Sequence, residues 1–182
     1  MALNETKFRE MILLIARRSD SDASYGATKL NKLLFFADFS AYRRFGRSIS
    51  GARYQKLEHG PAPRELLPVR ARMIADGQAV ELTRDYFGNV QRRLTPLVEP
   101  AIKSLSGEEV ALLDEVVQAY QGANASDTSE ISHQFAGWKY ALAGEDIPYE
   151  TALLVERPSM REDITEGERL NLRYGWTASR AK

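Results

Sequence analysis

The chain of 182 residues contains no cysteine. Disulfide bonds, thiolate metal sites and a cysteine nucleophile are therefore excluded. Histidine is almost as scarce, since only His59 and His133 occur. A transition-metal site would need carboxylates to complete its ligands, so the composition does not favour a metal protein.

Long apolar runs are also missing. The longest, residues 11–16, is interrupted by Arg17 and Arg18 and is far shorter than the roughly 18–20 residues that a membrane span requires. The start of the chain lacks the basic residues and long apolar stretch of a signal peptide. We therefore expect a cytoplasmic protein that has no membrane partner.

The net charge of zero conceals a division between the two halves. Residues 1–100 hold 17 Lys/Arg against 11 Asp/Glu, a net charge of +6, and residues 101–182 hold 8 against 14, a net charge of −6. Such asymmetry can indicate a basic face that meets an acidic partner or nucleic acid. It can equally mean that the two halves attract each other.

Two amphipathic helices are predicted first, over residues 4–18 and 28–45. Asn4 is expected to cap the first, while Thr28 and Gly46 are expected to bound the second. The second helix is apolar on several sides and should be central. Its aromatic residues fit a core better than a docking face, with Tyr42 and Phe45 as the pair expected to be more exposed. Its basic residues are expected to mark the polar edges: Lys29, Lys32, Arg43, Arg44 and Arg47.

The middle of the chain predicts an extended segment, a helix and a hairpin. Residues 52–57 are expected to be extended, and a helix should follow over 63–75 with a kink or a late start at Pro68. Residues 78–82 and 90–94 should form the hairpin. This order is typical of a winged helix.

The second half predicts further helices. Ser106 and Glu109 form a capping box, and Asp127 with Glu130 gives a second helix-start signal. The predicted fold is α+β and predominantly helical, with a winged-helix-like N-terminal half that carries a small antiparallel sheet or hairpin and packs against C-terminal helices. We expect one domain over residues 1–155 and a partly flexible extension over 156–182.

A winged helix that binds DNA is one hypothesis for function. Its third helix and its wing would present basic side chains to phosphates and bases. The candidate contacts are Arg64, Arg70, Arg72, Arg84, Arg92 and Arg93. The alternative interpretation of these arginines is solvated surface charge, which the pattern favours.

A hydrolase is a second hypothesis. Glu58 and His59 could be a base and its orienting partner, and His133 could join them. The neighbouring Gly60-Pro61 favours a structural turn instead. The chain has no Gly-x-Ser-x-Gly elbow, no phosphate-binding glycine loop and no His-Glu-x-x-His motif. These absences favour a protein that is not an enzyme.

Three motifs resemble the SocA-like Panacea-domain family. The helix reads KLNKLLFFA over residues 29–37, where the family shows Lys-Leu-x-Lys-Leu-Leu followed by two aromatic residues and Ala. His-Gly-Pro follows at 59–61, and a Ser-His pair precedes a tryptophan near residue 138. The residues that carry the resemblance are Lys29, Leu30, Lys32, Leu33, His59, Gly60, Pro61, Ser132, His133 and Trp138. Asn31 and the phenylalanines at 35 and 36 depart from the Gln and Tyr that are more usual there.

The resemblance covers roughly residues 5–150 and implies an antitoxin-like protein-binding domain from a bacterial or prophage toxin–antitoxin pair. Such a domain would neutralise a toxin encoded nearby by binding it directly, and one route is delivery of the toxin to a protease. The resemblance implies no catalytic residues and no cofactor.

Overall fold

The structure, a computed structural model, describes residues 2–154 and 169. Its elements follow in this order: α1 (Glu5–Arg18), α2 (Ala27–Phe45), β1 (Tyr54–Leu57), β2 (Gly60–Pro63), α3 (Leu66–Ala75), β3 (Ala79–Tyr86), β4 (Asn89–Pro96), α4 (Gly107–Ala119), α5 (Ala125–His133), α6 (Ala136–Tyr140), β5 (Asp146–Ile147) and a 3₁₀ helix, η1 (Tyr149–Leu153). The predominantly helical α+β class is confirmed. The extension predicted for 156–182 lies outside the described residues, apart from residue 169.

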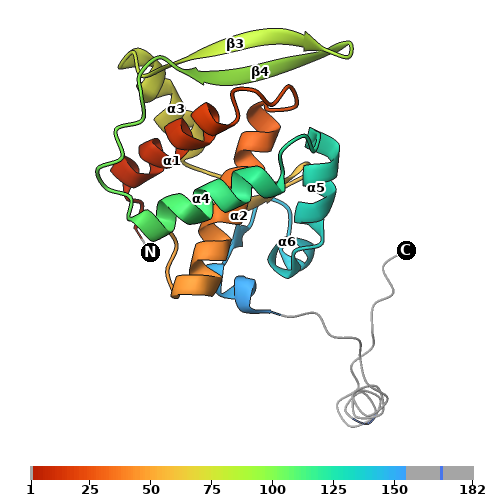
Figure 1. The fold of residues 1–182 in the computed structure, drawn as a ribbon. Coiled ribbons are helices and arrows are strands. Elements are labelled where there is room, and N and C mark those ends of the chain that lie inside the picture. Colours follow the sequence, from red (N-terminus) through yellow and green to blue (C-terminus); the bar gives the residue numbers. More distant parts are fainter. Residues whose placement is uncertain (1, 155–168, 170–182) are drawn as a thin grey trace.

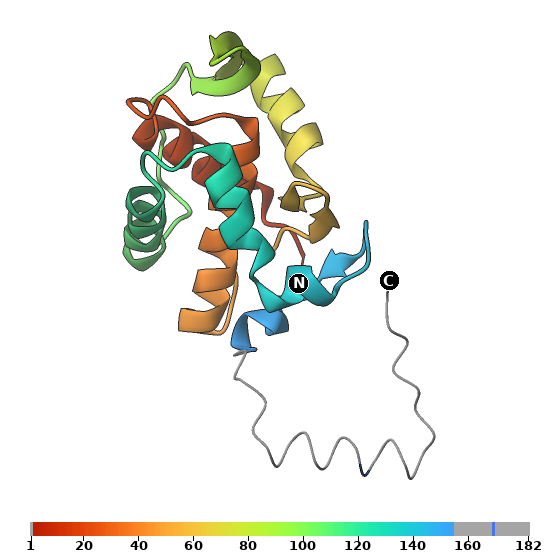
Figure 2. The same cartoon turned by 90° about the vertical axis from the view of Figure 1, so that its right-hand side faces the viewer.

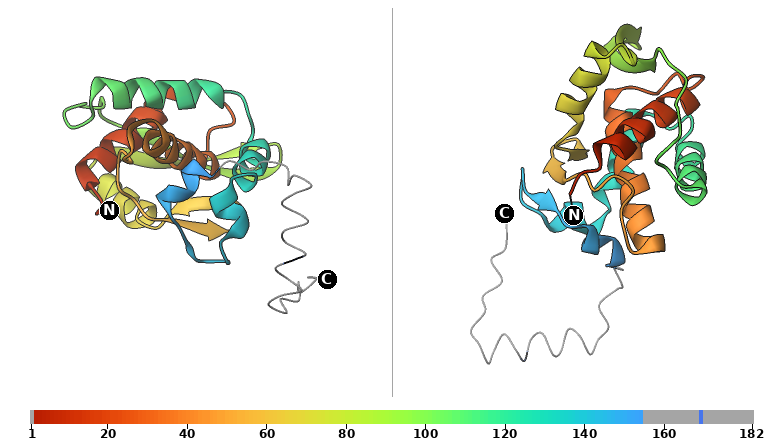
Figure 3. Two further views of the ribbon diagram at one scale, coloured as in Figure 1. Left: turned by 90° about the horizontal axis from the view of Figure 1, so that it is seen from below. Right: turned by 90° about the vertical axis from the view of Figure 1, so that its left-hand side faces the viewer.

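The helix α2 forms the centre of the molecule. The helices α1, α4 and α5 pack against it (Figures 1 and 2). Seen from below, α4 lies on one side of α2 and the small sheet of β1, β2 and β5 lies on the other (Figure 3). Within the described part of the chain, no helix is both long and apolar enough to cross a membrane.

The aromatic residues of α2 belong to the core, as predicted. Phe35 and Phe39 are buried, and their rings contact those of Tyr54 and Phe135 at centroid distances of 5.0–5.6 Å. Tyr42, which was expected to be more exposed, is partly buried. Its ring packs against the core and stacks on the ring of Tyr149, with the two centroids 5.7 Å apart. The interior therefore uses all sides of this helix.

Two of the predicted N-terminal helix caps are confirmed and two are wrong. The side chain of Asn4 accepts a hydrogen bond from the Lys7 backbone N–H (3.1 Å), and the capping box at the start of α4 is present. The N-cap of α2, however, is Gly26 and not Thr28, because the Leu30 backbone N–H already donates to the Gly26 carbonyl (2.9 Å). The N-cap of α5 is Asn124, three residues before Asp127, where the helix start was expected.

The proline-rich segment forms a strand where a helix start was expected. Gly60–Pro63 is β2, which pairs antiparallel with β1 at the edge of the three-stranded sheet. An edge strand tolerates proline, because its outward N–H groups are not needed for pairing. The helix α3 begins only at Leu66, so Pro68 lies in its first turn, where a missing N–H is harmless. The helix thus starts near Pro68, which is the second of the two expected outcomes, and not at residue 63.

The hairpin of β3 and β4 is longer than predicted. Eight residues pair on each strand, and the connection is reduced to Phe87 and Gly88. Both have positive φ angles, 52° and 78°, as in the type I′ turn that suits the twist of a two-residue hairpin. The hairpin lies over the start of α2 and close to α5 (Figure 1).

Candidate functional site

Lys29 and Lys32, expected at the polar edges of α2, are buried. Their side chains are 1% and 2% exposed. The expectation was wrong because segments distant in sequence cover both residues: the loop before α5 covers Lys29, and β2 covers Lys32. A buried cation must find compensating partners or shift its pKa, and the two lysines differ in this respect.

Lys29 is fully compensated. Its Nζ donates to Asp22 Oδ2 (2.5 Å), Ser24 Oγ (2.9 Å) and the carbonyl oxygen of Ala123 (2.7 Å). Burial alone would raise the pKa of Asp22, but the hydrogen bonds from Lys29 and Ser24 hold the pKa of that carboxyl below its usual range. This cluster ties the loop between α1 and α2 to the loop before α5.

Lys32 is poorly compensated. Its Nζ donates to one carbonyl, that of Pro61, at 3.1 Å. Burial lowers its pKa to about 8. A Cβ at Gly60 would stand 2.8 Å from this Nζ and 2.5 Å from Ser132 Oγ. Three of the motifs found in the sequence therefore meet here in close contact.

The third motif continues on the surface beside Lys32. The rings of His133 and Trp138 stack with centroids 3.9 Å apart, and Trp138 Nε1 donates to the Leu57 carbonyl oxygen (3.1 Å). Lys56 Nζ lies 4.4 Å from the centre of the Trp138 ring. Trp138 is half-buried and packs against the core. Burial, with a contribution from the charge of Lys32, lowers the pKa of His133.

The residues of the hydrolase hypothesis do not form a catalytic arrangement. Glu58 and His59 are exposed in the turn between β1 and β2. His133 Nε2 is buried without a hydrogen-bond partner, and no hydrogen bond within the described residues joins the three side chains. In the same part of the chain, no group of three His, Asp or Glu side chains could hold a metal ion.

Most arginines of the nucleic-acid hypothesis are engaged within the protein. Arg64 pairs with Asp146 (2.5 Å), and two further ion pairs tie α3 to its neighbours. These are Arg70 with Glu81 at 3.0 Å and Arg72 with Glu5 at 2.8 Å. Arg84 and Arg92 are exposed on the hairpin.

Arg93 lies in the interior. It donates to the carbonyl oxygens of Ser19 (2.8 Å), Asp20 (2.5 Å) and Asp22 (2.8 Å), and its guanidinium lies 5.1 Å from the centre of the Tyr25 ring. This arginine holds the hairpin onto the loop between α1 and α2. We call Arg93 a structural clamp, because it joins β4 to the loop between α1 and α2 and its guanidinium does not face solvent.

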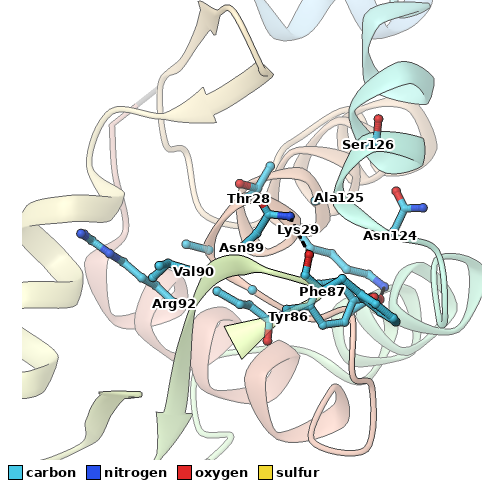
Figure 4. Close-up of a pocket in the computed structure, with 14 residues that line it drawn as sticks. Thr28, Lys29, Tyr86, Phe87, Asn89, Val90, Arg92, Asn124, Ala125 and Ser126 are labelled. Atoms are coloured by element: carbon cyan, nitrogen blue, oxygen red, sulfur yellow. Dashed lines mark hydrogen bonds between the residues drawn. The ribbon is translucent and has the colours of Figure 1, made fainter. Parts of the chain in front are cut away.

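An open cleft of about 770 Å³ lies between the hairpin and the starts of α2 and α5. Figure 4 shows Phe87 and Tyr86 of the hairpin opposite Thr28 and Lys29 of α2, with the first turn of α5 at one side. The complete lining is Ser24, Gly26, Ala27, Thr28, Lys29, Tyr86, Phe87, Asn89, Val90, Gln91, Arg92, Asn124, Ala125 and Ser126.

The cleft carries exposed apolar side chains at its hairpin wall. Phe87 is 88% exposed and Val90 is 74% exposed. The sequence did not predict this feature, because the three walls of the cleft come from segments that are distant in sequence. The available signal was the pair Tyr86-Phe87 immediately before Gly88.

The model of the antitoxin SocA-like, Panacea-domain family matches residues 30–139, more than half of the chain. The chain belongs to this family. The matched region of the Panacea domain runs from the first turns of α2 to the end of α6, and includes the hairpin and the start of α5. The family resemblance read from the sequence is thereby confirmed. No curated protein and no solved structure matches the chain.

The family is one of antitoxins and indicates a non-enzymatic role in a toxin–antitoxin pair. The motif residues Lys29, Lys32, Gly60 and Ser132 are buried, so they shape the domain and do not form an exposed surface.

Proposed function

We propose that this protein neutralises a cognate protein toxin, encoded close to it, by forming a direct complex. The observation that carries the proposal is the match of the antitoxin family to residues 30–139. The arrangement of the motif residues supports it, since they stabilise a scaffold and leave no catalytic constellation among the described side chains. A scaffold with an open cleft that carries exposed apolar side chains suits binding more than chemistry.

The direct test is co-expression with the product of the adjacent gene. We expect that product to arrest growth when expressed alone, and co-expression of this chain to restore growth. The purified pair should elute as one complex in size-exclusion chromatography. A harmless neighbour that forms no complex would overturn the proposal.

We further propose that neutralisation can proceed by delivery of the toxin to a protease. This finer claim is tested by the half-life of the toxin after translation is stopped. If this chain is an adaptor, its presence shortens the half-life, and deletion of the responsible protease lengthens it again. If the chain neutralises by binding alone, its presence leaves the half-life unchanged or lengthens it.

A further inference from the structure

We propose that the cleft between the hairpin and the starts of α2 and α5 binds a segment of the toxin that presents a carboxylate beside an aliphatic or aromatic side chain. The identity of the partner rests on the proposed function. The chemistry of the segment rests on the lining of the cleft, which is apolar at the hairpin tip and positive at Arg92 of β4 and at the N-terminal end of α2.

The hairpin tip supplies the apolar wall. Phe87 is the most exposed large apolar residue of the described chain, and its one aromatic contact is the ring of Tyr86 at 4.8 Å. It also occupies a left-handed backbone position (φ 52°), where asparagine or glycine would be favoured. A bulky aromatic side chain that is exposed at an unfavourable backbone position suggests a role in binding.

The remaining lining supplies a positive field. It contains no carboxylate, and the charge of Lys29 is matched by Asp22, so Arg92 is left as an exposed cation without an ion-pair partner among the described residues. The first turn of α2 has no acidic residue and no side-chain cap, so its N-terminal end adds partial positive charge. The hairpin carboxylate of Asp85 accepts a hydrogen bond from the Gly88 backbone N–H (3.3 Å) and is not part of the lining.

Internal contacts hold the three walls in place before any partner binds. Lys29 bonds the carbonyl of Ala123 just before α5, and Gln91 Nε2 donates to the Ala23 carbonyl (3.0 Å) from the hairpin. Gly26 allows the close approach of the hairpin, since a Cβ there would stand 2.9 Å from Gln91 Cγ. A preformed cleft avoids the cost of ordering its walls on association.

Substitutions in the cleft, measured against the adjacent gene's product, test the proposal. We expect Phe87→Ser combined with Val90→Ser to weaken binding about 30-fold, the loss typical of a buried aromatic anchor. Arg92→Gln should weaken it about 10-fold and flatten its dependence on NaCl. The matched controls are Leu67→Ser, exposed on α3, and Arg47→Gln, exposed beyond the opposite end of α2; both should stay within about 2-fold.

A second measurement does not depend on the toxin. A displayed library of random 12-residue peptides is selected on the full chain and on the Phe87→Ser/Val90→Ser variant, after thermal melts show that both are folded. We expect peptides that combine acidic and large apolar residues, and their loss on the variant. Peptides without this combination, or peptides retained by the variant, would contradict the assignment.

The toxin-binding measurements and the peptide selection together distinguish a failure of the cleft proposal from a failure of the proposed function. If the toxin binds all variants equally, the cleft proposal is overturned and the proposed function stands. If the neighbouring product does not bind but acidic–apolar peptides do, the chemistry of the cleft is supported and the proposed function fails. If the cleft variants lose binding to promoter DNA and keep toxin binding, the hairpin belongs to nucleic-acid recognition and the proposal is overturned.

Discussion

Lys32 places a cation in the interior with one carbonyl as its acceptor, and this makes stability depend on pH. Burial lowers its pKa to about 8 when folded, whereas the unfolded chain keeps the ordinary value of 10.5. The folded state then binds fewer protons between these values, so the free energy of unfolding should rise above pH 8. We expect a rise of roughly 1–2 kcal/mol between pH 7 and 9.5, measured by urea unfolding.

The control for this prediction is Lys32→Met, which should be at least as stable at pH 7 and should lose the rise. Measurement stops at pH 9.5, because Tyr25 and Tyr54 have raised pKa values when buried and reverse the trend at higher pH. A flat profile in the unsubstituted protein would refute the role assigned to Lys32.

Gly60 provides the second residue-scale prediction. Its φ is 98°, and an added Cβ would collide with Lys32 and Ser132. Gly77 also has a positive φ, 70°, but open space around it. Gly77→Ala should cost about 1 kcal/mol from backbone strain alone. Gly60→Ala should cost about 3 kcal/mol or more, since overpacking adds to the same strain. Equal losses in thermal melts would mean that the contact is not tight.

The burial of Lys29 and Lys32 was not predicted, because it depends on contacts with segments that are distant in sequence. The spacing of Lys29 and Lys32 places them beside the apolar face of a helix, and long lysines at such positions usually reach solvent. Lys29 is buried with Asp22 and Ser24, which are near in sequence, and with the carbonyl oxygen of Ala123, 94 residues later. The spacing of residues along a helix does not reveal such a distant partner. The sequence therefore showed the lysine motif but not that its lysines are buried.

At the scale of elements, prediction succeeded where the signal was local. The cap of α1 and the capping box of α4 depend on residues within one turn of each other, and both were predicted. The strand β2 was missed because its identity depends on pairing with β1, and its prolines suggested a turn. The cleft was missed for the same reason, since its walls meet only in the folded chain.

The hairpin turn gives a prediction that separates stability from binding. Phe87→Asn would create the Asn-Gly pair favoured in a type I′ turn and relieve the left-handed strain of a bulky residue. We expect a gain of about 0.5–1 kcal/mol in the free energy of unfolding. The same variant should bind the toxin about 10-fold or more weakly. Calorimetry of unfolding and of binding checks both halves, and unchanged affinity would remove Phe87 from the interface.

For the whole molecule, the charge division of the sequence is explained in part by internal pairing. Four ion pairs join residues 1–100 to the later part of the described chain: Lys7–Glu109, Arg18–Asp114, Arg44–Glu115 and Arg64–Asp146. Three of them are substantially exposed, and such pairs contribute little individually. The asymmetry therefore reflects attraction between the halves more than a basic face, although Arg92 is among the basic residues that take no part in this pairing.

Arg93 connects the hairpin to the rest of the molecule, and its removal should loosen the whole cleft. Arg93→Met would remove the guanidinium donor from three carbonyl oxygens, those of Ser19, Asp20 and Asp22. The carbonyls of Ser19 and Asp22 keep one backbone N–H donor each, so the loss comes from three charge-assisted hydrogen bonds. We expect a loss of about 3–4 kcal/mol in the free energy of unfolding and faster amide hydrogen exchange in β3 and β4. Arg84→Met, exposed on the same hairpin, is the matched control and should stay within about 0.5 kcal/mol.

The same pair of variants tests the two interpretations of the hairpin arginines. If Arg93 is a clamp, Arg93→Met weakens stability and toxin binding together, because the apolar wall of the cleft is no longer held over α2. If Arg93 is instead released to contact DNA phosphates, Arg93→Met leaves stability unchanged and lowers DNA affinity with a smaller salt dependence. The geometry of its three carbonyl acceptors favours the first result, and a stable Arg93→Met protein with a fully protected hairpin would contradict it.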